Sequence, residues 1–216
     1  MCRFKSAIIL KDRVFVPDYD SHTDMLEELK IQDTKANAER LFVRAELYPE
    51  NGDEFSNIDT WCFNVDQDIL PDWYVEEYDK QRMIDAVKEW AKDRIHIGVD
   101  GLRISGGDGH RIKDCKNVNI CGSATVKYIC GNATVEYICG SATVERICDS
   151  ATVEYICGSA TVEYICGSAT VITSGYAKWN NLSKAKLSDN ATIKDRLNKI
   201  IYQSGDWTFK AVKNEE

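Results

Sequence analysis

Six of the nine cysteines recur at a spacing of nine residues, and a cysteine thiolate can bind zinc or an iron–sulfur cluster. They are Cys121, Cys130, Cys139, Cys148, Cys157 and Cys166. Sites of those kinds gather ligands from irregular loops, often as CxxC pairs, whereas a regular repeat stacks its cysteines in lines. The chain has no CxxC pair. We therefore expect the thiols to pack as small residues at turns, with no metal and no cofactor.

Cys2 is the residue best placed for nucleophilic catalysis. Removal of Met1 would leave Cys2 with a thiol and a free α-amine, and that amine can act as the general base for the thiol. N-terminal nucleophile hydrolases use this arrangement, and Cys2 leads directly into the first expected strand. Arg3 stands where those families carry glycine. Cys2 supports an alternative hypothesis of a hydrolase or amidase.

Two further groups combine acidic and histidine side chains. Asp18, Asp20, His22 and Asp24 alternate along the chain, so an extended segment would place them on one face, where they could hold a divalent cation. Ser21 to Asp24 also fits the start of a helix, which is the simpler interpretation. In a glycine-rich stretch, Asp108 and His110 could form an acid–base pair.

A set of large outward-facing side chains recurs at the cysteine period and offers a binding surface. It comprises Tyr128, Tyr137, Arg146, Tyr155 and Tyr164, with Glu136 and Glu154 beside them. Tyrosine and arginine are enriched where proteins bind one another. The simpler interpretation is that the tyrosines only cover the corners of the fold. If they form a site, the expected partner is a protein.

These residues belong to six consecutive copies of one nine-residue unit, which starts at Cys121. The copies read CGSATVKYI, CGNATVEYI, CGSATVERI, CDSATVEYI, CGSATVEYI and CGSATVITS. A strict short period indicates one structural unit stacked on itself, which is a solenoid. The unit predicts a turn at Cys-Gly-Ser and a strand at Ala-Thr-Val-Glu-Tyr-Ile. Alanine, valine and isoleucine should point inward, with a bend near the Glu-Tyr step.

Two units make an eighteen-residue coil with two parallel sheets face to face. Equivalent residues then stack every second copy, so Val126 should lie over Val144 and Val162. The cysteines would form two lines, one from Cys121, Cys139 and Cys157 and the other from Cys130, Cys148 and Cys166. In the same coil Tyr137 would stack on Tyr155, and Tyr128 and Tyr164 would flank Arg146. A three-sided coil would also have eighteen residues, but its corners would be out of phase with a nine-residue period.

Residues 1–97 predict an α+β domain. A hairpin is expected over Lys5–Pro17, a helix after Ser21, and a short helix from Asp33 or Thr34. Strands are expected over 41–47 and 60–65. Pro71 and Asp72 suggest the start of a long helix that buries one face and stops before Gly98.

The solenoid should extend beyond the perfect copies, over residues 98–193. Its degenerate first rungs would be built from Leu102, Ile104, Ile112, Cys115 and Val118. A loop excursion is expected over 175–187, after which Asn190–Ile193 rejoin the stack, because Ala191 follows Ala169 by one coil plus four residues. Residues 194–216 should form a C-terminal cap, with a helix over Lys194–Tyr202 and a segment Trp207–Val212 covering the open sheet edges.

Composition and charge limit the expected cellular location of the protein and the class of partner that it can bind. No apolar run is long enough to span a bilayer, and Ala7–Leu10 is too short for a signal-peptide core, so we expect a cytoplasmic protein with reduced thiols and no membrane contact. Residues 1–113 carry 24 acidic and 16 basic side chains, whereas residues 176–216 carry 5 acidic and 8 basic ones. The acidic first part makes nucleic acid an unlikely partner.

The GNATV-type unit at Gly131–Val135 resembles the turn–strand repeats of hexapeptide-like β-solenoids. Its combination with the front segment FKSAIILKDRVFVPDYD also resembles uncharacterised proteins of gut bacteria and their phages. This resemblance covers nearly the whole chain. It implies an α+β domain on a β-solenoid and a phage or mobile-element source, and it implies no activity.

Three functional hypotheses follow. The leading one is a non-enzymatic binding or interaction protein that uses the solenoid as its scaffold, with a protein partner and possible homo-oligomers. The second is the enzyme with Cys2 as its nucleophile. The third is an inhibitor of a host nucleic-acid enzyme, in which stacked glutamates imitate phosphate spacing. The small net charge of the repeats, with 5 acidic and 3 basic side chains over 115–175, disfavours the third.

Overall fold

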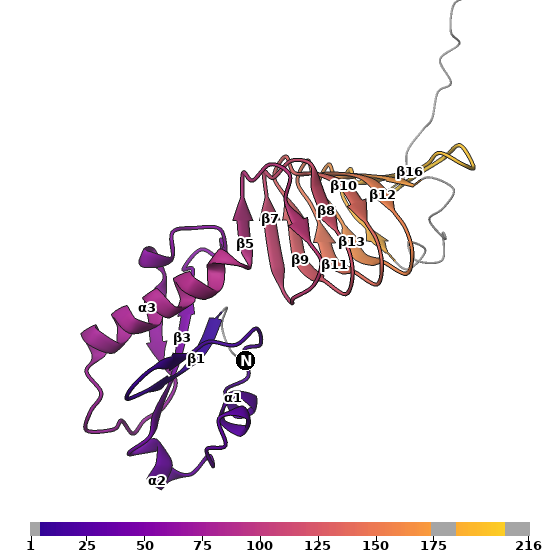
Figure 1. The fold of residues 1–216 in the computed structure, drawn as a ribbon. Coiled ribbons are helices and arrows are strands. Elements are labelled where there is room, and N and C mark those ends of the chain that lie inside the picture. Colours follow the sequence, from indigo (N-terminus) through magenta and orange to yellow (C-terminus); the bar gives the residue numbers. More distant parts are fainter. Residues whose placement is uncertain (1–4, 174–184, 206–216) are drawn as a thin grey trace, which may run out of the picture. The chain divides into compact units, whose positions relative to one another are not determined.

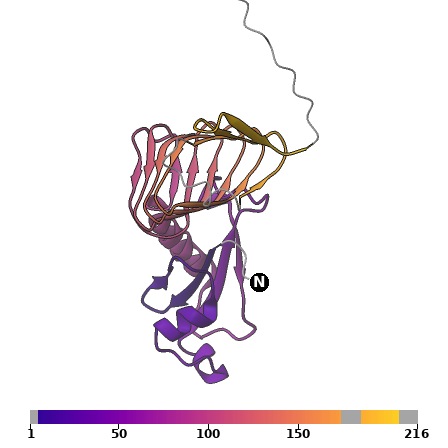
Figure 2. The same cartoon turned by 90° about the vertical axis from the view of Figure 1, so that its right-hand side faces the viewer.

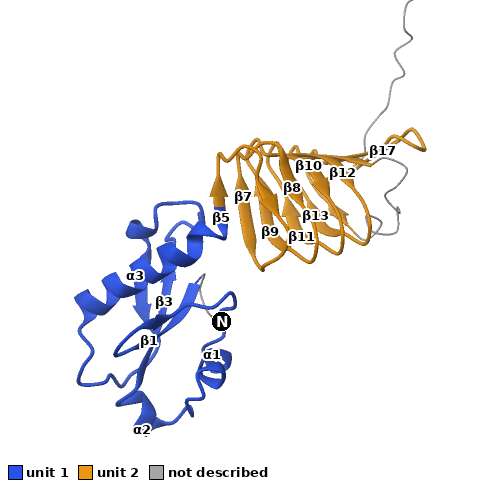
Figure 3. Cartoon of the chain, viewed as in Figure 1, with its two compact units in different colours: residues 1–95 blue, residues 96–216 orange. Residues whose placement is uncertain are grey.

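The computed structural model describes residues 5–173 and 185–205 and divides the chain into two compact units, residues 1–95 and 96–216 (Figure 3). Unit 1 is a small α+β fold, and unit 2 is a parallel β-solenoid. The expected fold class is confirmed. The first solenoid strand already begins at Ile95, since Ile95–Ile97 form a strand that pairs inside the solenoid.

The sheet of unit 1 has four antiparallel strands in the order β2-β1-β3-β4. β1 (Lys5–Leu10) and β2 (Val14–Phe15) form the expected hairpin. β1 also pairs with β3 (Phe42–Tyr48), which pairs with β4 (Cys62–Val65). A short 3₁₀ helix, η1 (Ile58–Thr60), precedes β4.

Helices cover both faces of this sheet (Figure 1). Successive residues of a strand point to opposite faces, so Ala7 and Ile9 pack under α3 (Glu76–Lys92), whereas Ile8 packs under α1 (His22–Glu28) and α2 (Lys35–Ala38). The expected cap of α1 is confirmed, because the Ser21 hydroxyl accepts the N–H of Asp24 at 3.3 Å.

The expected start of the long helix at Pro71 is wrong. Pro71 opens a turn, in which its carbonyl accepts the N–H of Tyr74, and α3 begins at Glu76. The buried Asp79 carboxylate decides this start, because it accepts the N–H of Val75 at 2.9 Å and so satisfies a donor that the first helical turn leaves unpaired. Proline alone therefore marked a turn and not the first helical position.

Unit 2 stacks its strands into two parallel sheets, whose successive coils lie side by side (Figures 1 and 2). The six-stranded sheet holds β5 (Ile95–Ile97), β7 (His110–Lys113), β9 (Thr125–Cys130), β11 (Thr143–Ile147), β13 (Thr161–Ile165) and β15 (Lys186–Leu187). The seven-stranded sheet holds β6 (Arg103–Ile104), β8 (Val118–Ile120), β10 (Thr134–Ile138), β12 (Thr152–Ile156), β14 (Thr170–Thr173), β16 (Thr192–Asp195) and β17 (Ile200–Gln203).

The eighteen-residue coil is confirmed by the strand register. Val144 pairs with Val126 on one side and with Val162 on the other, while Val135 belongs to the opposite sheet and pairs with Val153. Consecutive copies of the unit therefore alternate between the sheets. The expected two lines of cysteines follow from the same register.

The core of the solenoid repeats the inward residues of the unit. Its alanines, valines and isoleucines are at most 2% exposed along the six copies. Between the inward valine and isoleucine, two consecutive residues face outward, as Glu145 and Arg146 do in β11, and the pairing passes over Glu145. The expected bend near the Glu-Tyr step is therefore confirmed.

The first rungs are degenerate, as expected, and Ile104, Ile112, Cys115 and Val118 are all buried in the solenoid core. The other end contains one coil with four extra residues, since Thr192 pairs with Thr170. Most of the expected excursion lies outside the described residues, but its last part is wrong because Lys186–Leu187 form β15 and pair with β13. Asn190–Ile193 rejoin the stack as expected.

The expected helix over Lys194–Tyr202 is wrong. The chain forms a hairpin there, in which β17 pairs antiparallel with β16 and so extends the seven-stranded sheet by one strand. β16 would otherwise present unpaired backbone groups at the sheet edge, and strand pairing satisfies them where a helix would not. The expected segment Trp207–Val212 lies outside the described residues.

Among the residues that the structure describes, no helix has the length and apolarity that crossing a bilayer requires. The longest of these helices, α3, has 17 residues and exposes charged side chains along one face.

Candidate binding surfaces on the solenoid

The solenoid divides the expected binding residues between its two sheets. Tyr137 and Tyr155, with Glu136 and Glu154, lie on β10 and β12 of the seven-stranded sheet. Tyr128, Arg146 and Tyr164 lie on β9, β11 and β13 of the six-stranded sheet. The expected residues thus form two separate groups, because neighbouring copies belong to opposite sheets.

On the seven-stranded sheet, two tyrosines stack as the two-sided coil predicts. The rings of Tyr137 and Tyr155 are 5.3 Å apart between centroids and lie 15° from parallel. The carboxylate of Glu136 accepts a hydrogen bond from the Asn119 amide at 3.1 Å. The line of glutamates ends at Glu154, because Ile172 and Lys194 occupy the same position in the next two coils.

On the six-stranded sheet, cations alternate with tyrosines. The guanidinium of Arg146 lies 5.9 Å from the ring centroid of Tyr128 and 5.8 Å from that of Tyr164. One coil further, the ammonium of Lys186 lies 5.2 Å from the Tyr164 ring and 3.3 Å from its hydroxyl. Contacts of this kind contribute about 0.5–1 kcal/mol each at exposed positions.

The alternation begins one coil earlier, with Arg111 of β7. Arg111 pairs in register with Tyr128 and is 2% exposed. The order along the sheet is thus Arg111, Tyr128, Arg146, Tyr164 and Lys186, which we call the cation–tyrosine ladder. Arg111 is its buried end, and the other four residues form the surface that it presents to solvent. Neighbouring rungs are about 4.8 Å apart, so its cations recur at roughly 10 Å.

Sequence reasoning missed both ends of this ladder. Arg111 precedes Tyr128 by 17 residues because the register shifts at His110, and Lys186 follows Tyr164 by 22 because of the four extra residues. A search of the sequence for residues spaced by eighteen therefore misses both Arg111 and Lys186. Arg146 carried a visible signal, since it stands where four of the other copies have tyrosine.

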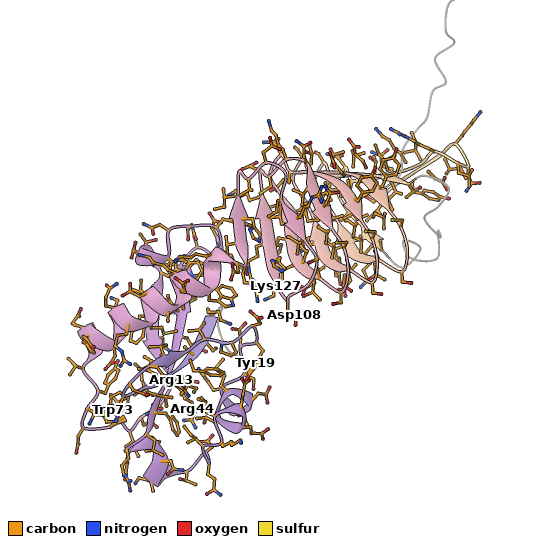
Figure 4. The ribbon with its side chains drawn as sticks, viewed as in Figure 1. Arg13, Tyr19, Arg44, Trp73, Asp108 and Lys127 are labelled. Atoms are coloured by element: carbon orange, nitrogen blue, oxygen red, sulfur yellow. The ribbon has the colours of Figure 1, made fainter. Side chains whose placement is uncertain are left out.

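A second line of outward side chains runs beside the ladder. It consists of Lys127, Glu145 and Glu163, one residue before the ladder position in each strand, and Figure 4 marks Lys127 among the side chains of the solenoid. Cations, aromatic rings and carboxylates thus share one flat face. Carboxylates beside the ladder repel phosphates, so this face favours a protein surface over a nucleic acid.

The alternating acids of unit 1 have separate partners and do not converge. Asp18 accepts hydrogen bonds from Arg94 and Trp90, and Asp20 pairs with the buried Lys5 at 2.7 Å. His22 lies between the Ala45 carbonyl and Asp66, and Asp24 lies in the first turn of α1, where its backbone N–H donates to the Ser21 hydroxyl. Each residue is explained by structure, and the four side chains offer no common cation site.

Asp18 also lines an open cavity of about 510 Å³ beside α3, together with Trp90 and Arg94. The hydrogen bonds from Arg94 and Trp90 hold the pKa of Asp18 below its ordinary value of 3.8, against the opposing effect of burial. The carboxylate is thus an ion-pair partner of Arg94 and is not a base held near neutrality. The three polar groups Asp18, Trp90 and Arg94 that line this cavity are thus already hydrogen-bonded to one another.

Asp108 and His110 do not form the expected pair. The Asp108 carboxylate accepts a hydrogen bond from the Thr125 hydroxyl at 3.1 Å. His110 is buried, its Nε2 lies 2.9 Å from the Gly106 carbonyl, and its Nδ1 lies 3.3 Å from Nε2 of the stacked His96. Through these contacts His110 stabilises the first coils of the solenoid.

The cysteines offer two candidate sites, one at Cys2 and one inside the repeats. Cys2 lies outside the described residues, so its catalytic role stays a prediction. Within the described part of the chain, one group of side chains could hold a metal ion, namely Cys130, Cys148 and Asp149. Sequence reasoning missed this group because its two cysteines are eighteen residues apart and Asp149 occupies a turn position that is glycine in the other copies.

No family model, no curated protein and no solved structure matches this chain. What the solenoid binds must therefore be inferred from its own surface chemistry. The cation–tyrosine ladder is the most extended arrangement of interaction-prone side chains on the described faces of the solenoid.

Proposed function

We propose that this chain is a non-enzymatic binding protein whose six-stranded solenoid face docks a protein partner. The observation that carries the proposal is the cation–tyrosine ladder, in which Arg146 lies between Tyr128 and Tyr164 at cation–π distance. Arginine and tyrosine are the residue types that most often dominate binding energy at protein interfaces. The resemblance of the repeats and front segment supports a phage or mobile-element source as part of the same proposal.

The ladder is suited to binding because its geometry is already ordered. Tyr128, Arg146 and Tyr164 stand on strands that are hydrogen-bonded to both neighbouring strands, and Arg146 is held between two rings. Association therefore costs less side-chain entropy than it would on loops. The mixture of cations with Glu145 and Glu163 fits a partner that presents both carboxylates and basic groups around an apolar centre.

The test compares the two sheets of the same solenoid. In one variant Tyr128, Arg146 and Tyr164 are replaced by serine, and in the matched control Tyr137 and Tyr155 are replaced by serine on the opposite sheet. Full-length chains are used as bait in a bacterial lysate, and any enriched protein is purified and its Kd measured. We expect the ladder variant to weaken binding by at least about thirty-fold, the size of a single hot-spot loss, and the control to bind as the wild type does.

Two results would contradict the proposal. One is a partner that binds both variants equally, since the ladder would then be irrelevant to it. The other is a partner whose binding is lost only in the control, which would move the site to the seven-stranded sheet. Light scattering on the purified chain identifies the case in which the partner is a second copy, because the ladder variant would then lower the measured mass.

A further inference from the structure

Cys130, Cys148 and Asp149 bring two sulfurs and one carboxylate oxygen to within 4.8 Å of one another. We propose that these three side chains form a site for one divalent ion of the zinc class, with water as the fourth ligand. The proposal is independent of the cation–tyrosine ladder, and it departs from the expectation that all six repeat cysteines only pack.

The coil explains how ligands distant in sequence meet. Cys148 follows Cys130 by one coil, so the two occupy the same position in neighbouring rungs of the six-stranded sheet; Asp149 then starts the turn. Cysteines alone would lie in a line, and a line of sulfurs cannot surround a metal ion. Asp149 changes that geometry, because its carboxylate approaches from the turn and not from the line of sulfurs.

Asp149 is held in a defined orientation. Its backbone has a φ of +56°, in the left-handed region that the glycines of the other turns occupy, and aspartate tolerates this region better than most residues do. Its Oδ2 accepts the N–H of Gly131 in the preceding coil at 2.9 Å. This hydrogen bond holds the carboxylate against the neighbouring coil, beside the two sulfurs.

The donor set suits zinc. Zinc binds sulfur at about 2.3 Å and carboxylate oxygen at about 2.0–2.2 Å, so two ligands of one tetrahedral ion are separated by roughly 3.4–3.8 Å. The three donor atoms here lie within 4.8 Å of one another. A side-chain movement of about 1 Å would therefore bring them onto one ion. Two thiolates, one carboxylate and an open fourth position is the ligand count of zinc sites that keep a water. Cys130 is buried, Cys148 is half-buried and Asp149 is exposed, which leaves one side open for ion and water.

The opposite sheet supplies an internal control. Cys121, Cys139 and Cys157 stack at the same rung spacing, but the residues after them are Gly122, Gly140 and Gly158. That line has the thiols without a carboxylate. A site that needs all three ligands should form at Cys148 and not at Cys139.

The experiment measures Zn²⁺ binding by the full chain in competition with a chromophoric chelator, and Co²⁺ absorption as a report on thiolate coordination. We expect one ion per chain in the wild type. Cys148→Ser and Asp149→Gly should each weaken binding at least ten-fold, whereas Cys139→Ser should not. Asp149→Gly restores the turn of the other copies, so it keeps the fold, which circular dichroism verifies.

Three outcomes would overturn the proposal. The first is no stoichiometric Zn²⁺ binding by the wild type. The second is an equal loss in Cys139→Ser and Cys148→Ser, which would mean an adventitious ion only, shared among surface thiols. The third is full retention by Asp149→Gly, which would remove the carboxylate from the site.

Discussion

The two units of this chain are stabilised by different kinds of contact. In unit 1 each element has its own partner, such as the buried Lys5 with Asp20 or Asp79 with the first turn of α3. In unit 2 one set of contacts is repeated, and Val144 makes with Val126 the same pairing that it makes with Val162. The consequence is that single substitutions of outward-facing residues should be tolerated in unit 2, whereas substitutions in its buried core or at its turns should be costly.

The largest single effect is expected at Asp20 in unit 1. Asp20→Ala would leave the ammonium of Lys5, whose side chain is 1% exposed, without its carboxylate. We expect a loss of about 2–3 kcal/mol in the free energy of unfolding, because the buried ammonium loses its opposite charge and keeps weaker contacts, such as its hydrogen bond to the Tyr19 carbonyl. Denaturant unfolding measures it. The double variant Lys5→Met with Asp20→Ala should recover most of the loss, and no recovery would mean that Asp20 acts otherwise.

The solenoid should be sensitive at its glycine turns. Gly140 has a φ of +71°, and an added Cβ would lie 2.8 Å from the backbone of Gly122 in the neighbouring coil. Gly140→Ala should therefore cost about 2 kcal/mol, of which roughly 1 kcal/mol is the left-handed backbone alone. Gly101→Ala is the control, since φ there is +72° with nothing within 4 Å. Equal melting temperatures for the two variants would show that coil-to-coil contact adds nothing.

Asp18 in unit 1 should make stability depend on pH. Because Arg94 and Trp90 lower its pKa in the folded state, the Asp18 carboxylate stabilises unit 1 above its ordinary pKa of 3.8, and this contribution is lost as pH falls through the lowered value. Asp18→Asn should thus cost about 1 kcal/mol at neutral pH, a value reduced for partial exposure. Near pH 3 the difference between variant and wild type should shrink. A difference that stays constant from pH 7 to pH 3 would contradict the assignment.

The smallest effect is expected on the solenoid face. Arg146→Tyr gives this copy the same residue as its neighbours, and the stacked pair Tyr137 and Tyr155 shows that the coil accommodates tyrosine on adjacent rungs. We expect a change under about 0.5 kcal/mol in stability, since surface substitutions in regular structure rarely exceed it. A loss above 1 kcal/mol would mean that the cations of the ladder hold the coils together.

The sequence predicted the solenoid well for a physical reason. One unit, seen six times, determines the inward residues, the bend and the register together, so each inference is checked by the next copy. The end of the solenoid has no such support. Leu197, Ile200 and Ile201 are spaced as on a helix, but the open edge of β16 offers backbone partners that only a strand can use, and the segment pairs as β17.

The candidate binding residues also divide into those that the repeat period predicts and those that it does not. Stacking of Tyr137 on Tyr155 and the place of Arg146 between two tyrosines followed from the period, and both are confirmed. Arg111 and Lys186 could not be found, because a register shift and four extra residues move them out of phase.

The most direct test of the account is a pair of deletions in the solenoid. Removing residues 139–156 takes out one coil and returns every later copy to its own sheet, so the chain should fold with a melting transition close to that of the wild type. Removing residues 139–147 moves every later copy to the opposite sheet and misplaces the hairpin β16–β17. Calorimetry should then show the solenoid transition lowered by more than about 5 °C, or aggregation from the uncovered edge. Equal transitions for the two deletions would contradict the eighteen-residue coil with two unlike faces.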